Sequence, residues 1–186
     1  MISGVSNSAQ PGVQGPAPGG VIRPALPEDA GALVALINAL ADETALMVIS
    51  RIDPVTGIAS VSAYLTQVAQ GNWRRVLVAD IGGTLAGLLI ADSDVSHPAK
   101  TGVVDIDLGV LRRFQRRGVG RALLASAENW ARAAGMHRLQ LKVMTHNAPA
   151  IALYEACAFV REGTLKNHLK LNTGFVDQHM MAKQIV

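Results

Sequence analysis

Gln115-Arg116-Arg117-Gly118-Val119-Gly120 joins a run of alternating apolar residues that ends at Val110 to a helical pattern that begins near Gly118. Its two glycines leave the backbone open to close approach, and the following helix offers unpaired N–H groups and a positive dipole end. With Arg121 one turn further on, the loop predicts a backbone-built anion site suited to a diphosphate. Taken alone, the loop is equally compatible with a plain helix start whose arginines face solvent.

The residues on either side of this loop predict a strand and a helix. In the strand 102–110, one face carries Asp105, Asp107 and Gly109, while the other carries valine, isoleucine and leucine. The helix after the loop ends at Gly135, and a second alternating strand follows over His137–Val143. A strand, a crossover helix and another strand therefore surround the predicted anion site.

The remaining patterns add further strands and helices. Strands are predicted at Val21–Pro24, Arg75–Asp80, Thr84–Ser93, Phe159–Leu171 and Phe175–Ile185, with a tight turn at Gly82-Gly83. Helices are predicted at Pro27–Leu46, Ser60–Ala69 and from the cap residue Asn147 to about Cys157. This order predicts an α/β or α+β domain with a mixed sheet.

Composition limits the class of protein. The chain has 186 residues, of which 49% are hydrophobic and 17% charged, so we expect one globular domain over residues 21–186. Residues 1–20 are rich in Gly, Pro, Ser and Gln and predict a flexible N-terminal tail. No apolar run is long enough for a membrane span and no secretory signal is evident, so no membrane partner is expected.

Charge and residue usage exclude further classes. A net charge of +3 with sparse aromatic residues gives little support to nucleic-acid binding. The five histidines show no metal-ligand spacing, so no metal is expected. The single cysteine, Cys157, rules out an internal disulfide and indicates a cytoplasmic protein.

A second motif follows the first at a defined distance. Asn147-Ala148-Pro149-Ala150-Ile151-Ala152-Leu153-Tyr154-Glu155, with Phe159 after it, resembles the N-x-x-A-x-x-L-Y-x-x-x-G-F pattern of the GNAT superfamily of N-acetyltransferases. The Q-R-R-G-V-G loop resembles the acetyl-CoA-binding motif of the same superfamily. The chain departs from the pattern at Ala158, where the family has Gly. If this position needs a positive φ, Ala costs about 1 kcal/mol there.

The resemblance implies a mixed, mostly antiparallel, splayed central sheet flanked by helices, and acetyl-CoA as the co-substrate. The pantetheine arm of acetyl-CoA is then expected to pair with the main chain of the strand end at Leu108, Gly109 and Val110. The diphosphate is expected on Gln115, Arg116, Arg117, Gly118, Val119, Gly120 and Arg121. Asn147, Ala150 and Tyr154 of the next helix are expected to face the arm.

The resemblance also implies direct attack of an amine on the acetyl thioester. Tyr154 is the expected acid for the leaving thiolate, and Asn147 and Tyr154 lie seven residues apart on nearly one line of the helix. A tyrosine that only fills the core is the alternative interpretation. Asp105 or Asp107 is the expected base, with Asp105 the better positional match, and solvated carboxylates are an equal alternative. The amine pKa of about 8 to 10 makes a base useful.

Together, the two motifs and the family resemblance predict that the protein transfers an acetyl group from acetyl-CoA to a primary amine of a small molecule or an amino acid. Two alternatives remain open: an acetyltransferase that acts on a protein N-terminus or lysine, and a module that binds acyl-CoA without turnover. The family resemblance also suggests a homodimer, with the hairpin over Phe159–Ile185 as the seam. The identity of the acceptor amine is not readable from the sequence.

Overall fold

The computed structural model describes residues 13–14, 20–44, 46–47, 50–94 and 101–185. Within these residues, one eight-stranded sheet has the order β1-β2-β3-β4-β5-β6-β8-β7. All neighbouring strands run antiparallel except β5 and β6, which are parallel. The strands are β1 (Val13–Gln14), β2 (Gly20–Pro24), β3 (Arg74–Ile81), β4 (Thr84–Ser93), β5 (Val103–Val110), β6 (Arg138–Met144), β7 (Val160–Leu171) and β8 (Gly174–Gln184).

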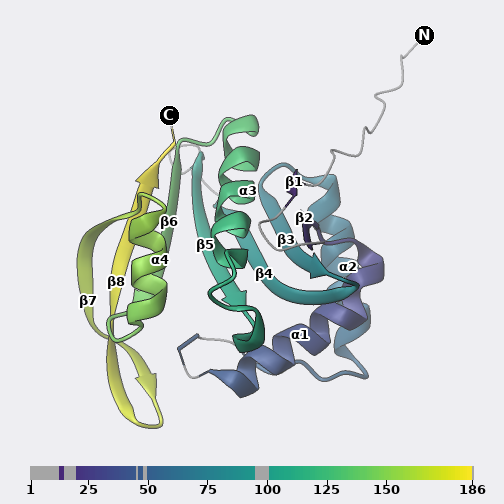
Figure 1. The fold of residues 1–186 in the computed structure, drawn as a ribbon, viewed down its shortest axis with the longest axis horizontal. Coiled ribbons are helices and arrows are strands. Elements are labelled where there is room, and N and C mark those ends of the chain that lie inside the picture. The colour runs from purple at the N-terminus through teal and green to yellow at the C-terminus, as the bar shows by residue number, and fades with distance from the viewer. Residues whose placement is uncertain (1–12, 15–19, 45, 48–49, 95–100, 186) are drawn as a thin grey trace.

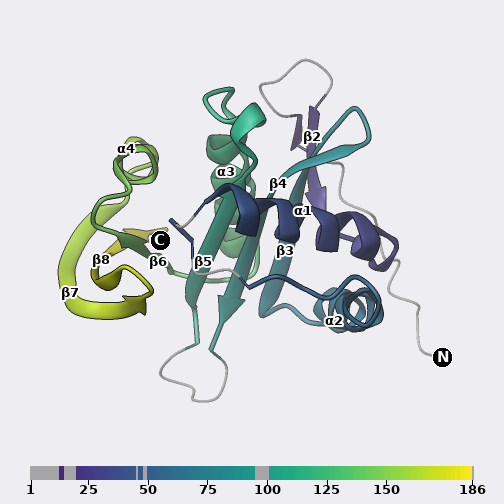
Figure 2. The same ribbon diagram turned by 90° about the horizontal axis from the view of Figure 1, so that it is seen from below.

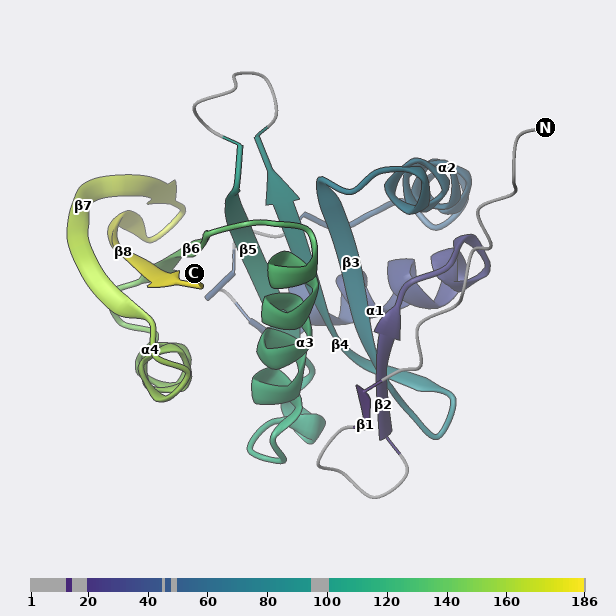
Figure 3. The same cartoon turned by 90° about the horizontal axis from the view of Figure 1, so that it is seen from above.

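Helices cover both faces of the sheet, as Figure 3 shows. Helices α1 (Ala30–Glu43) and α2 (Gly57–Gln70) lie on one face, and α3 (Val119–Ala133) and α4 (Ala148–Ala156) lie on the other. Each face has its own apolar core, one built around Leu36, Leu40 and Leu65 and the other around Leu123, Leu139 and Met181. This is the mixed, mostly antiparallel sheet with flanking helices that the sequence predicts.

The sheet opens between β5 and β6. Their pairing covers only the positions Val103 to Asp105 on β5 and Arg138 to Gln140 on β6. Beyond these residues the two strands run on without pairing and diverge, and α3, which packs on β3, β4 and β5, lies on one side of the opening (Figures 1 and 2). The expected splayed sheet is therefore present, and the splay lies beside the N-terminus of α3.

Local sequence explains how α3 and α4 begin and end. Helix α3 ends where the N–H of Gly135 donates to the carbonyl of Arg132 (3.0 Å) and the N–H of Met136 to that of Ala131 (2.9 Å). Gly135 has a φ of 73°, the left-handed conformation that this Schellman motif requires. At the start of α4, the side-chain oxygen of Asn147 accepts from the N–H of Ala150 (3.3 Å), as its predicted cap role requires.

Two expected elements differ from the structure. The helix predicted over Pro27–Leu46 is a short 3₁₀ turn, Pro27–Asp29, followed by α1, which ends at Glu43 because Thr44 is extended with a φ of −147°. The predicted tail contains β1, which pairs with β2, and β2 begins at Gly20. Residues 1–12 and 15–19 of that tail, and residues 95–100 between β4 and β5, lie outside the described residues.

The residues that the structure describes contain neither a membrane-spanning helix nor a cluster of metal-binding side chains. No helix there has the length and apolar character needed to cross a membrane. No group of three or more His, Cys, Asp or Glu side chains there is arranged to hold a metal ion.

Candidate active site

The edge of β5 that faces the splay carries free main-chain groups. The N–H of Leu111 donates to the carbonyl of Ala86 on β4 (3.0 Å). Because main-chain groups alternate in direction along an antiparallel strand, Asp107 and Gly109 also direct theirs toward β4, while Leu108 and Val110 direct theirs toward β6. Pairing with β6 has ended by then, so Leu108 and Val110 offer main-chain donors and acceptors to a ligand.

Gln115 satisfies one of these groups from within the chain. Its side-chain Nε2 donates to the carbonyl of Val110 (2.9 Å). The N–H of Val110 and both main-chain groups of Leu108 remain directed into the splay. Gln115 therefore joins the loop to the strand end, and its contribution to a bound diphosphate would come from its main chain.

The loop has the backbone geometry of an anion site. Arg116 and Gly118 both have positive φ values, 60° and 81°. Gly118 is the N-cap of α3, and no side chain caps this helix end. The N–H groups of the first turn, from Val119 to Arg121, therefore lack an intrahelical partner and point at the space where an anion would lie. The residues present fit a diphosphate.

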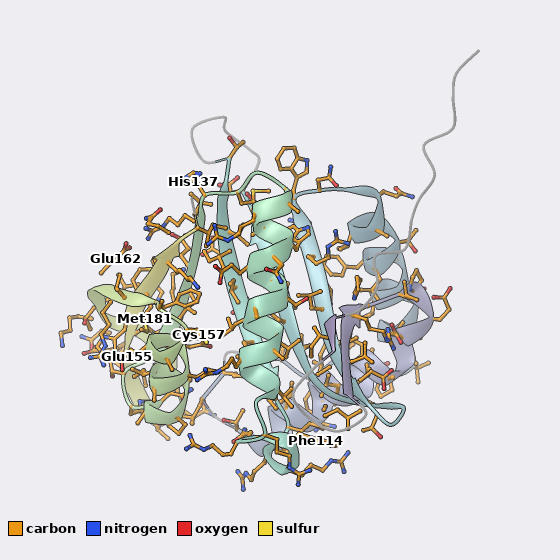
Figure 4. The ribbon with its side chains drawn as sticks, turned by 45° about the horizontal axis from the view of Figure 1, so that its top comes forward. Phe114, His137, Glu155, Cys157, Glu162 and Met181 are labelled. Carbon is orange, nitrogen blue, oxygen red and sulfur yellow. The ribbon has the colours of Figure 1, made fainter. Side chains whose placement is uncertain are left out.

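The arginines of the loop divide into two groups. Arg116 and Arg121 are exposed, and neither is held in an ion pair of the described residues. The guanidinium of Arg117 lies over the ring of Phe114, 5.9 Å from its centroid, and Phe114 occupies the loop end of α3 in Figure 4. Because Arg116 and Arg121 are the least restrained, they are the arginines most able to turn toward a phosphate.

Glu43 at the end of α1 anchors the strand end from the other side. Its carboxylate accepts from the N–H of Arg112 (2.7 Å), and its carbonyl accepts from the Arg112 guanidinium (2.9 Å). These two residues are 69 positions apart, so no local pattern in the sequence could have revealed the contact. Glu43 is a site-supporting residue that the sequence reasoning missed.

Gly120 serves helix packing. A Cβ at Gly120 would lie 2.8 Å from Cδ2 of Leu153 on α4, so the missing side chain lets α4 approach the N-terminus of α3. The buried Val119 side chain lies in the core, which leaves only its main chain for a ligand. Asn147 and Ala150, both half-buried in the first turn of α4, are thereby brought near the loop.

Tyr154 projects from α4 into the core beside the splay. Its exposed fraction is 7%, and its hydroxyl makes no hydrogen bond to any part of the chain that the structure describes. Burial, followed by the negative charge of Asp107, holds the pKa of the hydroxyl well above its ordinary value of 10.0. Tyr154 is therefore protonated at neutral pH, with a proton that no protein acceptor among the described residues takes.

Asp105 and Asp107 share a face, as predicted, but differ in their partners. Nε2 of Gln140 donates to Oδ1 of Asp105 (3.0 Å). Asp107 makes no hydrogen bond or ion pair within the described residues, and part of its side chain stays exposed. Desolvation by the surrounding protein, with the charge of Asp105, raises the pKa of Asp107 above its ordinary 3.8, while Lys142 opposes the rise.

The structure brings Asp107 and Tyr154 together across the splay. Asp107 is close enough for its charge to raise the pKa of the Tyr154 hydroxyl, although the two residues come from a strand and a helix. An unpartnered carboxylate and an unpartnered phenol thus flank the strand end, where both main-chain groups of Leu108 and the N–H of Val110 are free. This arrangement can accept a proton on one side of a bound carbonyl and donate one on the other.

Gly109 lies apart from this group. A Cβ there would lie 2.8 Å from Cδ1 of Leu40 and 3.2 Å from Cε of Met47, so Gly109 lets α1 and the chain after it close over β5. That chain is held in place by Asn38, whose side chain exchanges two hydrogen bonds with the main chain of Ile52 (2.8 and 2.9 Å). Residues 48–49, in the connection between α1 and α2, lie outside the described residues.

Cys157 lies outside the splay. It lines a shallow hollow between α3 and α4, and Figure 4 shows it on the side of α4 that faces α3. Burial raises the pKa of its thiol, and the nearby Lys183 is paired with Glu128 (2.6 Å). A protonated thiol is a poor nucleophile, which agrees with the interpretation of Cys157 as a packing residue.

Comparison with known proteins places the chain in a family. The profile described as "Acetyltransferase (GNAT) family" matches residues 51–159. An L-amino acid N-acetyltransferase of Escherichia coli (strain K12) is 36% identical over 113 residues, which cover 59% of this chain and 67% of that protein. A ribosomal protein bS18-alanine N-acetyltransferase of Salmonella typhimurium is 39% identical over 72 residues, which cover 39% of this chain and about half, 49%, of that protein.

A solved structure agrees with these matches over nearly the whole fold. The GNAT-family acetyltransferase from Streptococcus pneumoniae superimposes with a TM-score of 0.84 at 30% identity, covering 90% of this chain and 99% of that one. The acetyltransferases of this family use acetyl-CoA as the co-substrate. With its splayed sheet, its loop before α3 and its matching sequence, the chain belongs to the GNAT family of N-acetyltransferases.

Proposed function

We propose that the protein transfers the acetyl group of acetyl-CoA to a primary amine of a small molecule or an amino acid by direct attack. The observation that carries this proposal is the hydroxyl of Tyr154, a side chain that is 7% exposed yet makes no hydrogen bond within the described residues, beside the unpaired main chain of Leu108 and the free N–H of Val110. A structural tyrosine normally finds a hydrogen-bond partner for a buried hydroxyl. A hydroxyl left free at the edge of a cofactor cleft fits a proton donor.

Each group then has one task. The N–H groups from Gly118 to Arg121 hold the diphosphate, and the main chain of Leu108 and Val110 holds the arm and directs the N–H of Val110 at the thioester oxygen. The amine nitrogen bonds to the carbonyl carbon as the bond from that carbon to sulfur breaks. Tyr154 delivers its proton to the departing sulfur.

Asp107 is the better supported base of the two candidates. Asp105 is occupied by Gln140, whereas Asp107 has no partner in the described residues and influences Tyr154 electrostatically. Its raised pKa brings it closer to that of the amine, which improves proton transfer at neutral pH. Asp107 accepts the amine proton, directly or through one water molecule.

The test is an acceptor screen. Release of free CoA thiol from acetyl-CoA is measured over amino acids, polyamines, aminoglycosides and N-terminal peptides. We expect release with at least one small amine, and an acetyl-CoA-dependent rise in melting temperature without any acceptor. A rise in melting temperature with no thiol release from any acceptor would instead support a module that binds acyl-CoA without turnover.

A second candidate acceptor is a protein N-terminus. The resemblance to an enzyme named for ribosomal protein bS18 alanine favours it, although that match covers only half of the other protein. A peptide acceptor needs an open groove, and the main chain of Ile52 is held against α1 by its two hydrogen bonds with Asn38. Preferential turnover of peptides over free amino acids in the screen would select this candidate.

Three further proposals concern the whole molecule. One proposal is a single acetyltransferase domain over residues 21–186, to whose sheet β1 adds a short edge strand. Another is a cytoplasmic location, which one cysteine in 186 residues suits. The hairpin of β7 and β8 is proposed as a homodimer seam, since Val160 and Phe175 are 62% and 64% exposed. Light scattering of a Phe175→Ser variant tests the seam, and an unchanged molecular mass would exclude it.

A further inference from the structure

Two opposite charges face each other across the mouth of the splay. The last paired residues of β5 and β6 are Asp105 and Gln140. Asp107 and Lys142 lie two positions further along their strands, and side chains two positions apart in a strand share a face. The alternate residues of both strands, Val104, Ile106, Leu139 and Leu141, pack in the core with α3. Asp107 and Lys142 therefore lie on the opposite face of the sheet, where the strands have separated.

Neither charge is neutralised by the protein. Among the described residues, Lys142 and Asp107 form no ion pair or hydrogen bond. The neighbouring charges are already committed, since Arg138 is paired with Glu162 and Asp105 is bonded to Gln140. The residue opposite Lys142 on β8 is Met180, which offers no charge.

The two groups are close enough to influence each other and too far apart to pair. The charge of Lys142 acts on Asp107, yet no nitrogen–oxygen contact within 4.0 Å joins them. An unpaired cation and an unpaired anion on either side of the splay are complementary to a ligand that carries both charges on groups attached to one carbon.

We propose that Lys142 binds the carboxylate of a free α-amino acid while Asp107 receives its amino group, which makes Lys142 the residue that selects zwitterionic acceptors. This inference rests on the proposed acetyl transfer and narrows its acceptor. An α-amino acid places its ammonium and carboxylate on one carbon, so both fixed charges of the cleft are satisfied at once. The side chain of the amino acid then points out of the cleft.

Other amines fit this pair of charges less well. A polyamine brings a second cation toward the Lys142 ammonium, and like charges at such a site are repulsive. A peptide N-terminus has an amide in place of the carboxylate, so Lys142 stays unpaired. A site built for a charged group discriminates strongly against analogues that lack it, because its own group then loses a partner.

The experiment compares a free amino acid with its carboxamide in the wild type and in Lys142→Met, which keeps the apolar stem and removes the charge. We expect the wild type to have a higher kcat/KM for the free acid than for the carboxamide. In Lys142→Met this ratio is expected to fall at least about tenfold, because KM for the free acid rises. Because the ratio is compared between two enzymes, the different pKa values of the two amines cancel.

Two further variants define the specificity of the effect. Lys142→Arg keeps the charge and is expected to keep the preference. Lys170 is an exposed lysine of β7 that has no ion pair in the described residues, so Lys170→Met lowers the net charge by the same amount as Lys142→Met. We expect Lys170→Met to leave the preference for the free acid over the carboxamide unchanged. The acetyl-CoA-dependent rise in melting temperature, unchanged in all three, confirms that each variant folds and binds the co-substrate.

The outcomes separate this inference from the function on which it rests. Turnover of polyamines or peptides without turnover of free amino acids would overturn the role of Lys142 and leave the acetyltransferase intact. An acid-to-carboxamide ratio that Lys142→Met does not change would do the same. Failure of every amine in the wild type would remove both proposals.

Discussion

The ring of Tyr154 lies 5.9 Å from the ring of Phe159, and the N–H of Phe159 donates to the carbonyl of Tyr154 at 3.0 Å. The N–H of Ala158 also donates to the carbonyl of Glu155 at 3.0 Å. These are the two hydrogen bonds and the apolar contact of a Schellman motif. The end of α4 therefore fixes the position of the candidate acid.

Ala158 occupies the position of this motif that needs a left-handed residue, with a φ of 66°. We expect Ala158→Gly to stabilise the protein by about 1 kcal/mol, because glycine adopts this conformation without a steric cost. The corresponding rise in melting temperature is about 2–4 °C. Gly135→Ala, at the equivalent position of α3 with a φ of 73°, is the matched control and lowers it. A lower melting temperature in Ala158→Gly would contradict the strain.

Tyr154→Phe tests the acid directly. The hydroxyl has no partner in the described residues, so its removal is expected to leave the melting temperature and the acetyl-CoA-dependent shift nearly unchanged. The value of kcat is expected to fall by about 10²- to 10³-fold, as for loss of a general acid. The melting temperature, with and without acetyl-CoA, and kcat are measured on the same preparation. Unchanged turnover at every pH would eliminate the acid role.

Local features of the fold were predictable from the sequence because their causes are local. The turn at Gly82-Gly83 has φ values of 59° and 80°, as the glycine pair predicts, and joins strands close to the expected bounds. The alternation along β5 correctly placed Asp105 and Asp107 on one face. At position 158 the chain has Ala where the family motif has Gly, so a positive φ there would strain the backbone. The structure shows this positive φ at Ala158.

Long-range features were not predictable, because they depend on contacts between distant segments. Gln140, 35 residues from Asp105, donates to its carboxylate, whereas Asp107 has no partner in the described residues, a difference that the sequence alone does not show. The sequence predicts that Gly120 lets a phosphate approach the backbone, and the structure adds a second role, since a Cβ there would lie 2.8 Å from Cδ2 of Leu153 on α4. The early end of α1 places Glu43 against Arg112, a contact that pattern alone does not show.

Gly118→Ala tests the anion site. Gly118 has a φ of 81° at the N-cap of α3, so Ala is expected to cost about 1 kcal/mol and to tilt the first-turn N–H groups. The affinity for acetyl-CoA, measured by calorimetry, is expected to fall several-fold. Gly163→Ala is the matched control, since a Cβ there meets nothing within 4 Å and its φ is not positive. Equal affinities in the two variants would argue against a backbone-built site.

Asp107→Asn tests the base and carries a stability signature. The folded-state pKa of Asp107 is raised, so its charged form is disfavoured by folding and its contribution to stability is lost as pH rises through that pKa. Above the raised pKa the Asn variant is therefore expected to melt at the same or a higher temperature than the wild type. This difference is expected to vanish as pH falls to the ordinary carboxyl value of 3.8.

The same substitution is expected to lower kcat/KM by about 10²-fold or more at neutral pH, since a general base is lost. In the wild type, kcat/KM is expected to fall on the acid side as Asp107 is protonated, and this limb disappears in Asp107→Asn. Asp105→Asn is the matched control: its carboxylate is bonded to Gln140, and we expect it to retain the acid limb. If the acid-side fall of kcat/KM instead disappears in Asp105→Asn and persists in Asp107→Asn, Asp105 is the base.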